Sequence, residues 1–183
     1  GIKRDTERML TLYQRAGRLS TEITPKVNLL ENNRINITYE IEESDVAEVS
    51  KIIFLGNKIY NSAKLKSVMK TKEKRLLRFL SSADRYDPDK LEYDKQLITE
   101  FYNNNGYPDF TFTSSIAQLS LNSNDFEIIL TVSEGEQYEF GKIVVTSELK
   151  KLNPTAIEDA LPLSTGDIFD SSKIKTSIEE IKI

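Results

Sequence analysis

The chain has 183 residues and a net charge of −4, with 38% hydrophobic and 30% charged residues. It contains neither cysteine nor histidine, which excludes disulfides, zinc sites with thiolate or imidazole ligands, and catalysis by either side chain. The excess of acidic residues argues against a nucleic-acid partner, and no apolar run approaches the ~20 residues of a membrane-spanning helix.

The first segment, residues 1–45, repeats a pattern found later in the chain. The stretch "LYQRAGRLSTEIT" from Leu12 aligns with "FYNNNGYPDFTFT" from Phe101, and residues 35–44 align with residues 126–135. A unit of roughly 90 residues therefore recurs. The repeat predicts a helix followed by two strands for this first segment.

A complete unit begins in the second segment, residues 46–135. Residues 48–55, "EVSKIIFL", are rich in β-branched residues and predict a strand that ends in a turn at Gly56-Asn57. Asn61 or Ser62 can then cap a helix that ends near Lys72. The apolar face of this helix consists of Leu65, Val68 and Met69.

A second helix is predicted after Asp87 and Pro88, which suit its N-cap and its first position. The helix ends at the run 103–105, and Gly106 is expected to adopt the left-handed conformation that closes many helices. Its apolar residues are Leu91, Leu97, Ile98, Phe101 and Tyr102.

After Gly106 the hydrophobic period changes from helical to strand-like. The residues expected on one buried face are Phe110, Phe112, Ser114 and Ile116. Residues 126–134, "FEIILTVSE", are denser in apolar side chains and predict a central strand, which leaves the strand at 110–119 at a sheet edge. The unit is thus an α+β module with the order β-α-α-β-β.

The third segment, residues 136–183, repeats the start of this unit. "FGKIVVTSE" from Phe140 aligns with "VSKIIFLGN" from Val49, and "DSSKIKTSIEEI" from Asp170 aligns with "DPDKLEYDKQLI" from Asp87. These alignments predict a strand, a helix and the start of a second helix.

The order of elements, with "FLGN" after the first strand, "NNGY" before the second and "VSEGEQY" after the third, resembles the POTRA (polypeptide-transport-associated) module. Residues 70–110 resemble in particular the third such module of outer-membrane β-barrel assembly factors of Gram-negative bacteria. The resemblance implies a three-stranded mixed sheet covered on one face by two helices. Residues 1–45 would be the second half of module 2, and residues 136–183 the first half of module 4.

The resemblance also implies a periplasmic segment of an outer-membrane protein that is not an enzyme and needs no cofactor. Such modules bind unfolded β-barrel precursors and assembly lipoproteins and assist insertion into the outer membrane. Exposed sheet edges can pair with a further strand through the backbone alone. Two alternatives remain: a related translocation or secretion transporter, and a rigid spacer that binds no substrate.

Two stretches are candidates for partner contact. The edge strand carries no Lys or Glu, the residues that commonly oppose pairing with a further strand. However, any such sheet has an edge strand, whether or not it binds a partner. Its candidate residues are Phe110, Thr111, Phe112, Thr113, Ser114, Ser115, Ile116 and Ala117. The second stretch is apolar and basic, and it can equally plug the end of the core. It consists of Leu76, Leu77, Arg78, Phe79 and Leu80.

The joints between segments are too short and too poor in Gly and Ser to be loose linkers. We expect limited hinge motion at Ser44, Asp45, Gly135 and Glu136, with Gly135 as the pivot. The two incomplete segments supply complementary elements, so exchange between two copies of the chain is a further expectation.

Other chemistries have simpler explanations. The acidic cluster around Asp87 and Asp89 is explained by helix capping and the helix dipole rather than by a metal site. A hydrolase would require two carboxylates converging in a cleft, whereas the acidic residues here fall mostly at strand ends and helix starts. We therefore predict no catalytic residue and no metal ligand.

Overall fold

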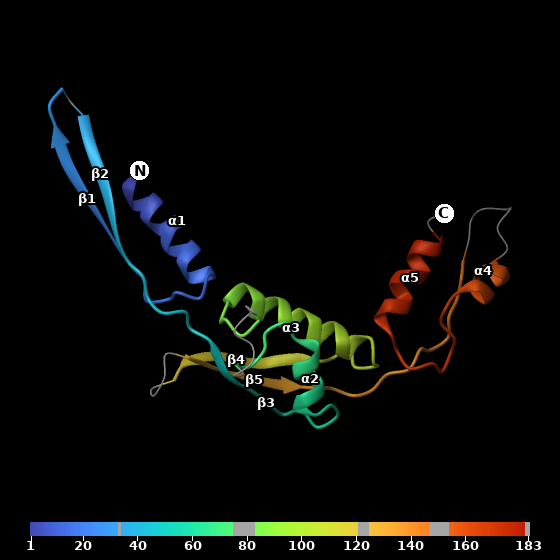
Figure 1. Ribbon diagram of the computed structural model, residues 1–183. Coiled ribbons are helices and arrows are strands. Elements are labelled where there is room, and N and C mark those ends of the chain that lie inside the picture. Colours follow the sequence, from blue (N-terminus) through green and yellow to red (C-terminus); the bar gives the residue numbers. More distant parts are fainter. Residues whose placement is uncertain (33, 75–82, 121–124, 147–153, 182–183) are drawn as a thin grey trace.

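The computed structural model describes residues 1–32, 34–74, 83–120, 125–146 and 154–181. Figure 1 shows the three segments following one another in a row, with the N-terminal hairpin at one end and the last two helices at the other. Among the described residues, none of the helices combines the length and hydropathy needed to cross a membrane.

The first segment consists of one helix and a β-hairpin. Helix α1 (Ile2–Arg15) lies beside the antiparallel strands β1 (Glu22–Leu30) and β2 (Arg34–Glu42) (Figure 1). One face of the hairpin is apolar, because Ile23, Val27 and Leu29 pair with Ile41, Ile37 and Ile35, respectively. The distal part of this face is exposed, and Leu29 has 84% of its surface accessible to solvent.

The second segment forms a three-stranded mixed sheet with two helices. Its elements are β3 (Val49–Leu55), α2 (Ser62–Val68), α3 (Pro88–Asn103), β4 (Thr111–Leu119) and β5 (Phe126–Ser133). The strand order is β3-β5-β4, with β3 parallel and β4 antiparallel to β5. The predicted order β-α-α-β-β and the central place of β5 are confirmed.

Helix α2 begins as its sequence predicts but ends earlier. The side chain of Asn61 accepts the N–H of Lys64 at 2.9 Å, and the helix stops at Val68 rather than near Lys72. The reason lies in α3, where the buried carboxylate of Asp94 accepts the N–H groups of Lys70 and Thr71 at 2.5 and 2.9 Å. These two amides therefore cannot continue the helical hydrogen-bond pattern.

Helix α3 has the predicted ends. The Asp87 carboxylate accepts the N–H groups of Asp89 and Lys90 at 2.9 and 3.3 Å, and Pro88 occupies the first turn, where it loses no helical hydrogen bond. Beyond the other end, Gly106 adopts a φ of +96°, as the sequence predicts.

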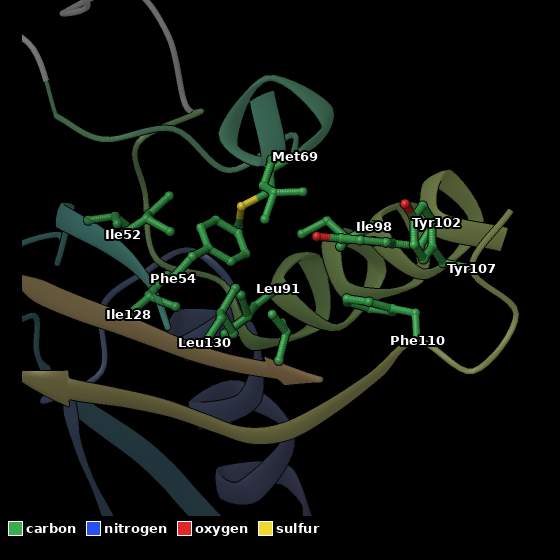
Figure 2. Close-up of a cluster of buried hydrophobic side chains, with 13 residues drawn as sticks. Ile52, Phe54, Met69, Leu91, Ile98, Tyr102, Tyr107, Phe110, Ile128 and Leu130 are labelled. Atoms are coloured by element: carbon green, nitrogen blue, oxygen red, sulfur yellow. The ribbon is translucent and has the colours of Figure 1, made fainter. Parts of the chain in front are cut away.

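The core lies between one face of this sheet and the two helices (Figure 2). Strands β3 and β5 contribute Ile52, Ile128 and Leu130, each at most 2% exposed. At one end of the core, the Tyr102 ring on α3 stacks on Phe110, with ring centroids 3.9 Å apart (Figure 2). The aromatic residues at the junction of α3 and β4 therefore fix how the helix joins the edge strand.

The predicted buried face of β4 is wrong beyond Phe112. Phe112 pairs with Val132 and Ser114 with Thr131, so Thr113 forms a β-bulge. An extra residue in one strand of a pair moves every later side chain to the opposite face. As a result, Ala117 packs against the core, whereas Ile116 is 47% exposed.

The third segment contains the predicted helices but lacks the predicted strand. Helices α4 (Pro154–Ala160) and α5 (Ser171–Ile181) are present. Within the described residues 136–146, however, the only strand-like pairing is the isolated bridge of Glu139 with Ile168. In the central module β3 is held by its pairing with β5, whereas within the described residues 136–146 and 154–181 no strand pairs with residues 140–146.

A candidate strand-binding edge

Strand β4 lies at the outer edge of the central sheet, because β5 is the only one of the described strands that pairs with it. Of the backbone hydrogen bonds between described residues, none reaches the outer side of Thr111–Leu119. The outward N–H and C=O groups of such an edge can pair with a further strand. The structure thus places the predicted residues from Thr111 to Ala117 on one accessible strand, with Phe110 buried at its start.

The first half of the opposite edge of the sheet, formed by β3, is occupied. The Glu73 carboxylate accepts the N–H of Ile52 at 2.8 Å, and the N–H of Lys74 donates to the carbonyl of Val49 at 2.8 Å. The segment that follows α2 therefore satisfies edge groups that another strand would need. Among the described residues, the central sheet thus has one partly occupied edge, at β3, and one open edge, at β4.

A groove runs between α3 and the start of β4. Its floor includes Phe112, and Lys95 lies above this ring, with its Nζ 5.9 Å from the centroid. Lys95 also pairs with Glu92 at 2.6 Å on the same helix. The groove extends to α5, which contributes Ser171 and Lys175. Side chains of an added strand that point toward α3 would therefore meet both aromatic and polar surfaces.

A buried carboxylate at the end of β5 forms hydrogen bonds to two other parts of the central module. Glu134 is only 7% exposed, and it accepts the N–H groups of Lys58 and Ile59 at distances between 2.6 and 3.1 Å. It also accepts the N–H of Tyr60 at 3.4 Å and the hydroxyl of Tyr102 at 2.7 Å. The end of β5, the turn after β3 and helix α3 are thus joined at one side chain.

Hydrogen bonding decides the ionisation of this carboxylate. Burial acts to raise the pKa of Glu134, but the hydrogen bonds from Tyr102 and from three backbone N–H groups outweigh it and lower the pKa. Burial and the hydrogen bond to Glu134 both raise the pKa of Tyr102. Glu134 is therefore the charged acceptor and Tyr102 the neutral donor at neutral pH.

The predicted hinge residues lie at the two joints. Ser44 donates its N–H to Thr21 Oγ1 at 3.3 Å, and Asp45 is exposed. Gly135 has a φ of +72°, and a Cβ built on it would lie 2.9 Å from the Cβ of Asp109; Glu136 is exposed. Hinge motion at these positions stays a prediction.

One predicted contact stretch is not described by the structure, and two buried carboxylates were not predicted. The second candidate stretch, Leu76 to Leu80, lies outside the described residues. Sequence reasoning missed Asp94 and Glu134, whose buried carboxylates accept backbone N–H groups. A signal existed for Asp94, because it falls at helical spacing between Leu91 and Ile98 on the apolar face.

Comparison with known proteins supports the resemblance seen in the sequence. Residues 47–135 match the POTRA family model, described as a surface antigen variable number repeat. The chain is 29% identical over 170 residues to the outer membrane protein assembly factor BamA of Neisseria meningitidis, covering 93% of this chain and 21% of the relative. The BamA of Neorickettsia risticii is 26% identical over 155 residues, covering 85% and 21%. This chain thus spans about a fifth of the length of these curated relatives.

A solved structure shows the same fold. The crystal structure of POTRA domains 3–5 of Haemophilus influenzae BamA superposes with a TM-score of 0.56 and 15% sequence identity. The match covers 99% of this chain and 68% of that one.

Proposed function

Because residues 47–135 match the POTRA family model, we propose that this chain is a periplasmic protein-binding segment of an outer-membrane protein assembly factor. In this role it binds unfolded β-barrel precursors and accessory lipoproteins and assists insertion of the precursors into the outer membrane. Binding occurs by addition of a substrate strand to the outer edge of β4. The role requires no catalysis, and the relatives named above are assembly factors rather than enzymes.

The observation that carries this proposal is the difference between the two edges of the central sheet. Glu73 and Lys74 occupy the β3 edge, whereas the β4 edge has no described backbone partner. Pairing through backbone N–H and C=O groups depends little on side-chain identity. A segment that serves many different barrel strands benefits from such tolerance.

An NMR titration with amide resolution tests the proposal. The ligand is an unfolded peptide of about ten residues with alternating polar and apolar side chains, the length of a typical outer-membrane strand. We expect chemical-shift changes concentrated on β4, from Thr111 to Leu119. We also expect slower hydrogen exchange of the outward amides once they donate to the peptide.

A modified peptide and two substitutions separate pairing at the β4 edge from other contacts. A peptide of the same sequence, N-methylated at alternate residues, keeps its side chains but loses the donors on one edge, and it should not bind. The substitution Ile116→Lys places a charge on the exposed face of the edge strand and should weaken binding. Lys51→Gln, on the guarded strand β3, should leave binding unchanged.

Different shift patterns would indicate different roles. Changes confined to residues 76–80 would contradict strand addition and indicate a partner contact in that connection. If neither region responds, the chain is a spacer that positions its neighbours.

The incomplete segments favour association of two copies as a second role. The distal part of the apolar face of the β1–β2 hairpin is uncovered, with Val27 49% and Ile35 53% exposed. Residues 141–146, which align with β3, form no strand, and Val144 is 64% exposed. If this stretch paired with the hairpin of a second copy, the two chains together would complete one module, and the reciprocal contact would complete another. Helices α1 and α5 would then compete for the same position in each composite module. Light scattering that finds only monomers at high micromolar concentration contradicts this exchange.

A further inference from the structure

The groove beside β4 is walled by two successive modules. Helix α3 and the start of β4 belong to the central module, whereas Ser171 and Lys175 belong to the first turns of α5 in the next one. The end of the groove near Thr111 therefore exists only while the two modules keep their relative orientation.

Three contacts hold α5 at this end of the groove. The ammonium of Lys175 lies 3.2 Å from the carboxylate of Glu100 on α3, and both side chains are at least half exposed. The hydroxyl of Ser171 donates to the side-chain carbonyl of Asn104 at 2.5 Å. In the backbone, the N–H of Tyr138 donates to the carbonyl of Gly106 at 2.8 Å.

The same arrangement occurs at the preceding joint. There the N–H of Ala47 donates to the carbonyl of Gly17, the glycine that aligns with Gly106, also at 2.8 Å. The end of α1 is linked to the first turn of α3 by Arg15, whose Nε lies 3.3 Å from the Asp89 carboxylate. Each joint thus combines a glycine carbonyl with a contact from the end of α1 to the start of α3, or from the end of α3 to the start of α5. The two joints therefore share this arrangement.

The geometry points to a strand-binding site shared between modules, in which a strand added to β4 ends against the first turns of α5. This inference rests on the proposed function, since it requires a strand at β4. A strand that contacts α5 binds best when α5 is in place, and it must in turn stabilise that orientation of the joint. Substrate binding and the angle between the modules are therefore coupled.

Charge reversal at the groove end tests the coupling. Lys175→Glu turns the attraction to Glu100 into repulsion, and the double variant Glu100→Lys/Lys175→Glu restores an opposite-charge pair. For a peptide that spans all of β4, we expect about three- to tenfold weaker binding to Lys175→Glu, in line with the small energies of exposed ion pairs, and recovery in the double variant. Lys142→Glu makes the same charge change at an exposed position outside the groove and should leave the affinity unchanged.

A shorter peptide and a distance measurement give independent readouts. A peptide truncated at the end that faces Thr111 should bind the wild type and Lys175→Glu equally well. Because the chain has no cysteine, spin labels can be attached at Tyr93→Cys and Ile178→Cys, both exposed positions on α3 and α5. The full-length peptide should narrow the distribution of distances between them.

The outcomes distinguish this inference from the proposed function. The shared site is refuted, while strand addition stands, if the peptide changes the chemical shifts of the β4 amides but binds Lys175→Glu as tightly as wild type and leaves the distance distribution between the spin labels unchanged. If the peptide leaves β4 unperturbed in the wild type, strand addition fails and the shared site fails with it.

Discussion

The hydroxyl of Tyr102 donates a 2.7 Å hydrogen bond to the carboxylate of Glu134, which also accepts N–H groups from the turn after β3. Tyr102 itself stacks on Phe110 directly before the edge strand. Glu134 therefore supports the aromatic residues that position β4.

Replacing Glu134 by Ala should lower the free energy of unfolding by about 2 to 4 kcal/mol, because buried N–H groups and the Tyr102 hydroxyl lose a charged acceptor. Urea denaturation followed by circular dichroism measures the loss. Glu136→Ala removes an exposed carboxylate two residues away and should change stability very little. Equal effects of the two substitutions would show that Glu134 does not join these elements.

Stability should fall at acid pH through the same residue. The folded-state pKa of Glu134 is lowered, so its contribution is complete above the unfolded pKa of about 4.3 and is lost as pH falls through the folded value. The difference in unfolding free energy between wild type and Glu134→Gln should therefore shrink as the pH approaches 3 or so. A difference that stays constant across this range would contradict the assignment of the charge.

Asp94→Ala should destabilise the central module by about 1 to 3 kcal/mol, because the N–H groups of Lys70 and Thr71 lose their acceptor. Thermal unfolding compares this variant with Glu92→Ala, which removes an exposed carboxylate on the same helix. Glu92 contributes only a surface ion pair to Lys95, so its removal should cost less than about 1 kcal/mol. The reverse order would mean that Asp94 does not hold α2 against α3.

Gly135→Ala should destabilise the joint by about 1 to 2 kcal/mol, since its φ of +72° is costly for a residue with a Cβ. Gly141→Ala is the matched control, because a Cβ there meets no atom within 4 Å. Small-angle scattering should also show a changed distribution of shapes for Gly135→Ala alone. Identical scattering from all three proteins would argue against Gly135 as the pivot.

Local sequence signals predict most of the central module because each acts within a few residues. Asn61 and Asp87 cap helices through their nearest amides, and Gly106 takes the conformation that a side chain disfavours. The bulge at Thr113 could not be predicted, because it depends on how β4 aligns with β5 and not on β4 alone. The strand expected in the stretch that begins at Phe140 is not formed within the described residues 140–146 for a similar reason, since a strand needs a partner.

The candidate site divides in the same way. Alternation and the lack of guarding charges indicate an edge strand, and the structure has β4 at the edge. The occupation of the opposite edge by Glu73 and Lys74 depends on a backbone reversal after α2 that no local pattern encodes. The contribution of α5 to the groove likewise depends on the joint, which brings residues about 70 positions apart into contact.

The unequal edges of the central sheet also limit how copies of this module can polymerise. A sheet with two open edges can add a copy on each side and grow into a fibre. Among the described residues, Glu73 and Lys74 occupy the N–H of Ile52 and the carbonyl of Val49 on β3, which disfavours joining of two central sheets through that edge and leaves β4 as the more open one. Two sheets that join through their β4 edges form a pair that cannot grow by the same contact, and a strand added to β4 would compete with that pairing.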